Sequence, residues 1–115
     1  MKKLLFHLGH VNRAAIRAAN EGRFGDAMFQ LHLAQLLARD LDSPLQVARV
    51  ENNLGMVLLL QDKTDEALGH LRKAVDIARE FRGDEHPFVQ RLTRQLDELC
   101  GRSEREERLG AVVNG

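Results

Sequence analysis

The chain repeats itself at an interval of about 40 residues, and this repetition restricts its fold more than any other feature. Moved forward by 40 positions, residues 23–40 fall on residues 63–80, and size and charge match at nine pairs. The equivalent pairs are Arg23/Lys63, Asp26/Glu66, Ala27/Ala67, Leu31/Leu71, Ala34/Ala74, Leu37/Ile77, Ala38/Ala78, Arg39/Arg79 and Asp40/Glu80. A shift of 42 places Val47, Arg49, Val50 and Leu54 on Val89, Arg91, Leu92 and Leu96. Such a period indicates stacked supersecondary units, here two units and a half.

Each unit is predicted to be a pair of helices. Within residues 65–81, apolar residues recur at alternating spacings of four and three, which places them on one face of a helix. These residues are Ala67, Leu71, Ala74, Ala78 and Phe81. Breaks rich in Gly, Asp and Pro separate predicted helices at about 3–20, 26–41, 45–60, 65–81 and 88–100. The predicted fold class is all-α, with one domain over residues 1–102 and a short charged helix and frayed tail over 103–115.

The composition excludes several classes of function. Lys plus Arg and Asp plus Glu both number 17, so the chain as a whole has no net charge with which to attract nucleic acid, although a local basic face is still possible. No apolar run approaches the roughly 18 residues that a membrane-spanning helix needs. The single cysteine, Cys100, excludes an internal disulfide and a multi-cysteine metal site and fits a reducing compartment. We therefore expect a cytoplasmic protein that binds neither nucleic acid nor membrane.

The sequence holds no recognisable catalytic or cofactor site. His7 and His10 are three residues apart on one helical face, but no third metal ligand lies near them in the sequence. There is no glycine-rich phosphate loop, and no nucleophile is paired with a base. We therefore predict a protein that is not an enzyme and that carries no metal and no cofactor.

The central unit carries a family resemblance. One helix has a large residue followed by glycine, and the next helix has alanines and a leucine at helical spacing. These residues are Leu54, Gly55, Ala67, Leu71 and Ala74. They resemble the signature of the tetratricopeptide repeat, and the small residues let packed helices approach closely. The runs 52–55, 61–67 and 83–87 are similar to its kinesin-light-chain subclass, whose repeats are near 42 residues.

The resemblance implies a right-handed solenoid of helical hairpins, made of two repeat units and a C-terminal capping helix. The cap is expected because Asp97 occupies a position where the repeat has a small residue. In this family the first helix of each pair lines a concave groove that binds an extended or helical peptide. Asn53 matches an asparagine that holds the backbone of the ligand in such repeats.

The resemblance places ten residues of this chain in the groove. They are Asn12, Arg13, Ile16, Arg49, Asn52, Asn53, Met56, Arg91, Arg94 and Gln95. Amides and arginines dominate the set, and Ile16 and Met56 form an apolar floor. We therefore predict a protein or peptide partner with acidic residues beside an apolar anchor. The alternative is that these arginines belong to an ordinary solvated face.

The second helix carries an additional apolar stripe, which we call the outer stripe, at Phe29, Leu33 and Leu36. The equivalent positions of the next unit are Gly69, Lys73 and Asp76. An outward apolar stripe needs a cover. Residues 1–8 or the C-terminal tail could fold over it, a second copy of the chain could pack on it as a homodimer, or a partner could bind there. The alternative function is therefore a self-assembling structural module.

Overall fold

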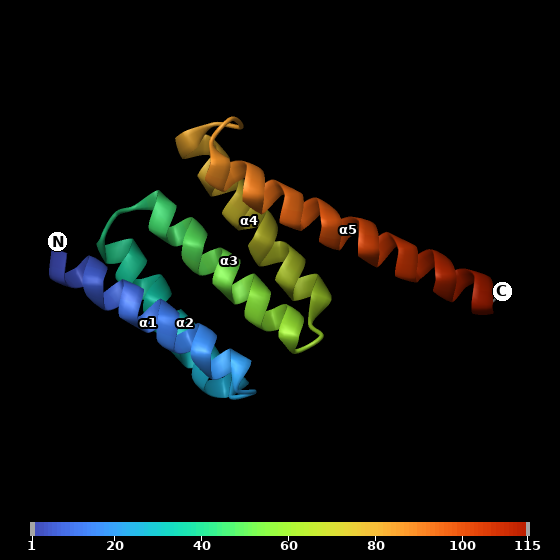
Figure 1. The fold of residues 1–115 in the computed structure, drawn as a ribbon, viewed down its shortest axis with the longest axis horizontal. Coiled ribbons are helices and arrows are strands. Elements are labelled where there is room, and N and C mark those ends of the chain that lie inside the picture. The colour runs from blue at the N-terminus through green and yellow to red at the C-terminus, as the bar shows by residue number, and fades with distance from the viewer. Residues whose placement is uncertain (1, 115) are drawn as a thin grey trace.

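The computed structural model describes the backbone of residues 2–114 and the side chains of residues 2–102. This part of the chain contains five helices and no strand (Figure 1). The helices are α1 (Lys2–Asn20), α2 (Phe24–Asp40), α3 (Pro44–Leu60), α4 (Thr64–Arg82) and α5 (Pro87–Asn114). The predicted all-α architecture of helical hairpins is confirmed. The first four helices begin and end within two residues of the predicted positions.

The two hairpins close through the same turn. In each, the residue before the second helix donates its backbone N–H to a carbonyl five residues earlier, at 2.8 Å in the first hairpin and 3.0 Å in the second. The preceding residue has a positive φ, 78° at Gly22 and 60° at Asp62. These positions are equivalent in the 40-residue repeat. Between the hairpins, Ser43 caps α3 by accepting a hydrogen bond on its side chain, and Pro44 begins the helix.

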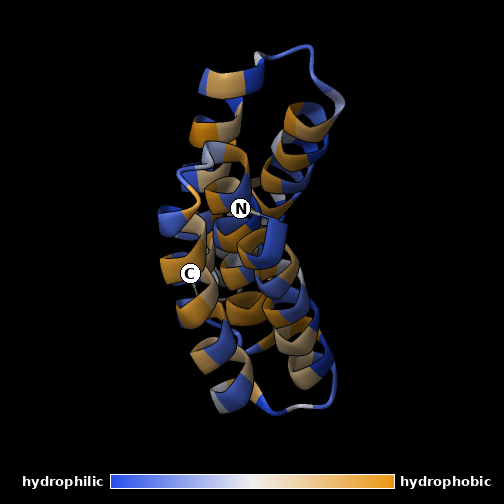
Figure 2. Cartoon of the chain, turned by 90° about the vertical axis from the view of Figure 1, so that its left-hand side faces the viewer, coloured by the Kyte–Doolittle hydropathy of each residue, from blue (hydrophilic) through white to orange (hydrophobic). Residues whose placement is uncertain are grey.

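Two apolar clusters hold the helices together. The first joins α1, α2 and α3 and includes Leu8, Val11, Ala15, Leu31, Ala34, Val50, Leu54 and Val57. The second joins α3, α4 and α5 and consists of Ala48, Ala74, Val75, Ala78, Val89 and Leu92. In Figure 2 the helices carry hydrophobic and hydrophilic residues on different sides, as this packing requires. Each helix pair therefore contributes to a core shared with its neighbour.

Helix α4 packs against α3 at Gly55 with no room for a side chain there. A Cβ atom at this position would lie 2.6 Å from the side chain of Leu71 and 3.1 Å from the backbone oxygen of Ala67. Real Cβ atoms do not come so close to other atoms. The packing role predicted for Gly55 and Ala67 is confirmed.

The predicted end of the fifth helix is wrong. Residue Gly101 is helical, and α5 continues without a break to Asn114 (Figure 1). No separate short helix follows residue 102. The reason is that a glycine within a helix costs only about 1 kcal/mol relative to alanine, and the residues after Gly101 include strong helix formers. The backbone of the predicted frayed tail is helical as far as Asn114. Its last residue, Gly115, lies outside the described part of the chain.

The outward face of α5 is polar, as expected for the last helix of a repeat array. Its exposed residues between 87 and 102 include Gln90, Arg91, Arg94, Asp97 and Glu98. The apolar face, with Val89 and Leu92, packs against the rest of the molecule. This segment of α5 therefore covers the second apolar cluster as the predicted capping helix.

Phe81 ends the apolar stripe that the sequence predicts for α4, but it is not buried. Its side chain is 58% exposed. Phe81 lies in the last turn of α4, where the chain leaves for the linker to α5. The buried face of α4 ends one turn earlier, at Ala78.

Candidate functional site

A hollow of about 490 Å³ lies between α1, α3 and the start of α5. We call it the central hollow. It is lined by Leu5, Gly9, Asn12, Arg13, Gln46, Arg49, Asn52, Asn53, Phe88 and Arg91. Six of these ten residues are ones that the sequence assigned to the groove. The structure therefore brings together Asn12, Arg13, Arg49, Asn52, Asn53 and Arg91.

Three of the other predicted groove residues lie elsewhere on α1, α3 and α5. Ile16 is half-buried and packs against the first apolar cluster. Met56 and Gln95 line a separate hollow of about 440 Å³ near the C-terminal end of α3. Within that hollow the amide of Gln95 donates to the sulfur of Met56 at 2.6 Å. The apolar contribution to the central hollow comes instead from Phe88 and Leu5.

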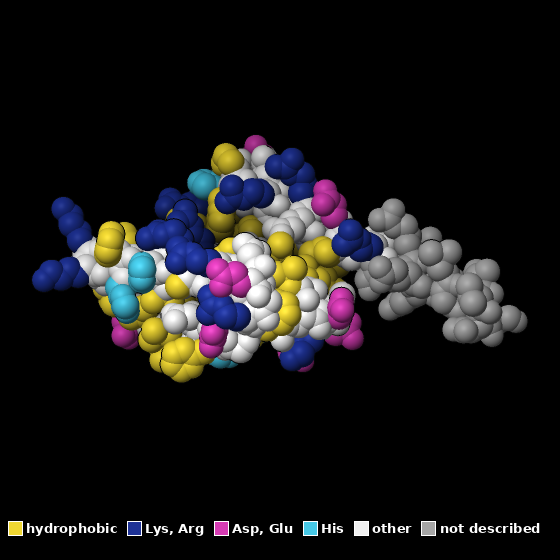
Figure 3. Space-filling view, turned by 60° about the horizontal axis from the view of Figure 1, so that its bottom comes forward, with side chains coloured by type: hydrophobic (Ala, Val, Ile, Leu, Met, Phe, Trp, Pro, Cys, Tyr) yellow, Lys and Arg dark blue, Asp and Glu magenta, His cyan; other side chains and the backbone are white. Residues whose placement is uncertain are grey.

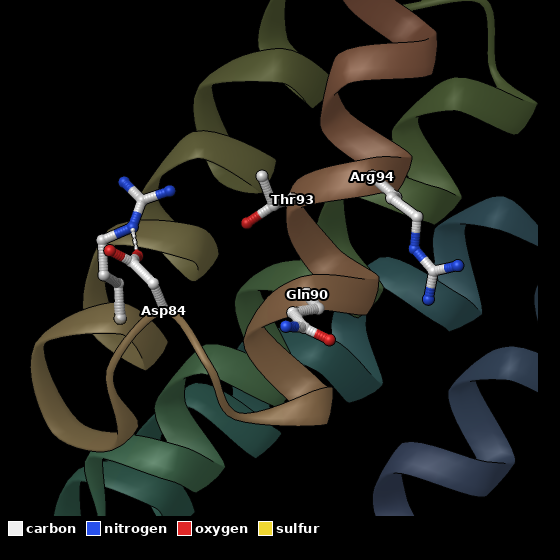
Figure 4. A pocket seen from close by; sticks show the side chains of 5 residues that line it. Asp84, Gln90, Thr93 and Arg94 are labelled. Atoms are coloured by element: carbon white, nitrogen blue, oxygen red, sulfur yellow. Dashed lines mark hydrogen bonds and ion pairs between the residues drawn. The ribbon is translucent and has the colours of Figure 1, made fainter.

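Arg94 lies at a third hollow, of about 740 Å³, between α5, α4 and the linker that joins them. In Figure 4, Gln90 and Thr93 lie on α5 between Arg94 and Asp84. Asp84 accepts a hydrogen bond from Arg79 at 2.6 Å within an ion pair. Arg94 thus lines a different hollow from Arg13, Arg49 and Arg91.

The central hollow is strongly basic. Three of its ten lining residues are arginines, from α1, α3 and α5, and none is acidic. No ion pair joins these three arginines to an acidic residue in the described part of the chain. The guanidinium carbons of Arg49 and Arg91 lie 5.8 Å and 5.4 Å from the centre of the Phe88 ring. Both cations therefore rest against one aromatic ring, a favourable cation–π arrangement.

Side-chain amides line the same hollow. The amide nitrogen of Asn53 donates to the side-chain oxygen of Asn12 at 3.2 Å and so connects α3 to α1. An asparagine amide carries one acceptor oxygen and two donor hydrogens. The bonded pair therefore keeps the oxygen of Asn53 and the nitrogen of Asn12 for other partners. The side-chain oxygen of Asn52 is buried and has no hydrogen-bond partner among the described residues.

Two lining residues that sequence reasoning missed occupy equivalent positions. Gln46 and Phe88 lie 42 residues apart, each three residues before an arginine of the hollow. The same shift that pairs Arg49 with Arg91 would have found them. His86 supports Phe88, because its Nδ1 accepts the backbone N–H of Phe88 at 3.2 Å in the first turn of α5.

Gly9 was missed as well. Its lack of a side chain leaves room for the side chain of Arg13. A Cβ atom at Gly9 would lie 3.3 Å from a terminal nitrogen of Arg13. The absent side chain lets the Arg13 guanidinium lie along α1 at the hollow. A glycine inside a predicted helix gave no sequence signal for this role.

The most important feature missed from the sequence is a buried carboxylate on α3. Glu51 is only 2% exposed. His70 contacts it at 2.6 Å, Gln35 donates to it at 3.2 Å, and the ammonium of Lys73 lies at 3.3 Å. We call these four residues the Glu51 cluster. It ties α3 to both α2 and α4.

Opposing effects act on the pKa of Glu51. Burial raises the pKa, because the charged form loses contact with water. The hydrogen bonds from His70 and Gln35 and the charge of Lys73 lower it and outweigh burial, so the pKa lies below its usual value. Glu51 is therefore a carboxylate at neutral pH.

Within the described residues, no three His, Cys, Asp or Glu side chains lie close enough together to hold a metal ion. None of the helices in that part of the chain is both long and apolar enough to cross a membrane.

Residues 46–108 match the family described as tetratricopeptide repeat. This stretch contains nearly all of α3, all of α4 and most of α5, which together contribute Gln46, Arg49, Asn52, Asn53, Phe88 and Arg91 to the central hollow. No solved structure matches the chain. The match covers more than half of the sequence and falls on helical hairpins of the expected kind, so the chain belongs to the tetratricopeptide repeat family.

Proposed function

We propose that this protein is a non-catalytic adaptor whose central hollow binds a peptide segment of a partner protein. Tetratricopeptide repeats generally mediate protein–protein interactions. The observation that carries the proposal is the set of three arginines without an acidic neighbour, beside amides with unused hydrogen-bonding groups. The partner segment carries acidic residues next to an apolar anchor.

Each part of the hollow suits one part of such a segment. The free oxygen of Asn53 and the free amide nitrogen of Asn12 match the N–H and C=O of a peptide backbone. Arg13, Arg49 and Arg91 bind carboxylates through charge-assisted hydrogen bonds. The Phe88 ring offers the apolar surface that the sequence had assigned to Ile16 and Met56.

The proposal extends to the subclass and the location. Helix α3 begins 42 residues after α1, and α5 begins 43 residues after α3, which supports the kinesin-light-chain-like subclass. The cytoplasmic location stays a prediction, based on the single cysteine.

Affinity capture from native lysate with mass spectrometry tests the adaptor function. The variant Asn53→Ala/Arg91→Ala removes one amide and one arginine from the hollow. Asn20→Ala/Arg82→Ala is a matched control at exposed positions outside it. The hollow variant is expected to lose the partner while it keeps its helical fold, with a loss of stability of only about 1 kcal/mol from the missing Asn53–Asn12 hydrogen bond. The control is expected to retain the partner. Equal capture by all three proteins would refute the assignment of the hollow.

A second candidate function is self-assembly through the outer stripe. Phe29 is 69% exposed and Leu36 is 55% exposed, whereas Leu33 is half-buried against the first apolar cluster. No described residue covers Phe29 and Leu36, since both side chains remain exposed, and α5 leads away from the N-terminal hairpin (Figure 1). Figure 3 shows hydrophobic side chains exposed along the edge formed by this hairpin.

Light scattering after size-exclusion chromatography tests this second function. Wild type is expected to form a dimer at high micromolar concentration, and Phe29→Asp is expected to be monomeric. Phe81→Asp is the matched control, because Phe81 is similarly exposed but lies at the end of α4. A monomeric wild type would contradict self-assembly through this surface.

A further inference from the structure

The charge of the central hollow exceeds what one carboxylate can neutralise. Three guanidiniums reach the hollow, and the ten lining residues include no acid. Other arginines of the chain are handled differently: Arg23 pairs with Glu21 and Asp26, and Arg79 pairs with Asp84. The whole chain has no net charge, so the excess is local to this site. An occupant with more than one negative charge complements it best.

Two of these charges lie near the same aromatic ring, that of Phe88. Arg49 comes from α3 and Arg91 from α5, and their guanidiniums lie over the same ring. Both side chains are exposed, so each is free to turn toward an anion held at the ring. A group bound there must offer acceptors to two planar guanidinium forks.

Carboxylates and phosphate monoesters differ in how well they meet this demand. A carboxylate has one negative charge and two oxygens, which satisfy one arginine in bidentate fashion. A phosphorylated side chain carries about 1.5 to 2 negative charges at neutral pH and three strong acceptor oxygens. It satisfies Arg49 and Arg91 together and leaves Arg13 for a neighbouring acidic group.

The surroundings of this anion site favour a peptide over a nucleic acid or a lipid surface. The Asn12–Asn53 pair beside the arginines offers the donor and acceptor that one backbone amide needs. The site is a concave hollow of about 490 Å³, which a flat membrane surface cannot enter. Nucleic acid binding needs basic charge along an extended track, and the chain as a whole is neutral.

We propose that the central hollow recognises a phosphorylated serine or threonine within the partner segment. Arg49 and Arg91 hold the phosphate through their guanidiniums, which Phe88 supports from the other side by cation–π contact, and the Asn12–Asn53 pair holds the adjacent backbone. The inference rests on the proposed peptide-binding function. It makes the interaction dependent on phosphorylation of the partner.

A titration with three small probes tests this proposal. The probes are N-acetyl-phosphoserine methylamide, N-acetyl-glutamate methylamide and N-acetyl-serine methylamide, and NMR follows the side-chain signals of Arg49, Arg91 and Asn53 in the full chain. The phosphoserine probe is expected to bind about tenfold more tightly than the glutamate probe, because it engages a second charged donor. The serine probe is expected to give no saturable shift.

Two further measurements make the result specific. Lowering the pH from about 7.5 to about 5 is expected to reduce the phosphoserine preference, because the second phosphate pKa is about 6. Arg49→Gln and Arg91→Gln are each expected to weaken phosphoserine binding about tenfold. Arg82→Gln, at an exposed position outside the hollow, is the matched control and is expected to have no effect.

The possible failures are distinguishable. Equal affinity for the phosphoserine and glutamate probes overturns the phosphate inference and leaves the acidic-peptide function standing. Absence of any saturable shift at Arg49, Arg91 and Asn53 overturns both. Tighter binding of a short oligothymidylate than of the phosphoserine probe assigns the hollow to nucleic acid and also overturns the inference.

Discussion

The Glu51 cluster predicts that His70 stabilises the fold by its contact with the buried carboxylate of Glu51. His70 is the nearest partner of a carboxylate that is 2% exposed, at 2.6 Å. In His70→Ala that carboxylate keeps only Gln35 at 3.2 Å and Lys73 at 3.3 Å. A hydrogen bond to a charged group contributes about 1.5–3 kcal/mol. Because His70 is itself partly exposed and two partners remain, we expect a loss of about 1.5–2 kcal/mol, at the lower end of that range.

Chemical denaturation followed by far-UV circular dichroism measures this loss at neutral pH. In thermal unfolding it corresponds to a decrease in Tm of about 6–12 °C for a domain of this size. The matched variant is Glu51→Leu, which replaces the buried charge by an apolar side chain. Its stability is expected to remain within about 1 kcal/mol of wild type, because removing a buried charge also removes its desolvation cost. The double variant is expected to recover most of what His70→Ala loses.

The pH dependence gives an independent check on the same residue. The pKa of Glu51 in the folded protein lies below its ordinary value of 4.5. A lowered pKa means that the carboxylate stabilises the fold fully above that ordinary value and loses its contribution as the pH falls through the lowered one. The difference in stability between wild type and His70→Ala should therefore shrink in this acid range. A difference that is absent at neutral pH, or unchanged below the pKa of Glu51, would refute the role of the cluster.

Three glycine-related predictions follow from the backbone geometry. Gly55→Ala should destabilise the protein by about 1–3 kcal/mol in denaturant titration, because the new Cβ atom would press on Leu71. Gly69→Ala is the control: the space around Gly69 is open, so this variant should not lose stability. Gly101→Ala should stabilise the protein by about 0.5–1 kcal/mol and raise its helical circular dichroism signal, since Gly101 is helical and uncrowded. Asp62→Gly should stabilise the protein by a few tenths to about 1 kcal/mol in the same titration, because Asp62 has a φ of 60°; a destabilised variant would contradict a backbone origin.

The helices and the repeat were predictable because both depend on local sequence periodicity. The 42-residue shift set residues of α3 against those of α5, and the resemblance to the tetratricopeptide repeat placed ten groove residues on α1, α3 and α5. Six of these ten lie together. The limits of this reasoning appear at Met56 and Gln95. Both have groove register, but they lie farther along their helices and line a different hollow. The register of a residue gives the face of the helix on which it lies, but not which hollow between the helices it lines.

Contacts between helices were not predictable from the sequence. A glutamate between Val50 and Asn52 gives no sign that it is buried, because its partners come from α2 and α4, at positions 16, 19 and 22 residues away. Likewise, a single glycine in a charged segment predicts a helix end at Gly101 as readily as a helix interior. In the structure, packing between the helices buries Glu51. Helix α5 continues without a break through Gly101.

The three consecutive residues Glu51, Asn52 and Asn53 link the core to the central hollow. Residues two positions apart on a helix point in nearly opposite directions, about 200° apart. Glu51 therefore bonds to Gln35 of α2 on one side of α3, while Asn53 bonds to Asn12 of α1 on the other. These two polar bonds attach α3 to both helices of the first hairpin, beside the apolar cluster that the three helices share. Arg49, Asn52 and Asn53 lie on the same helix, so the bond from Asn53 to Asn12 also helps to hold the hollow side of α3 beside α1.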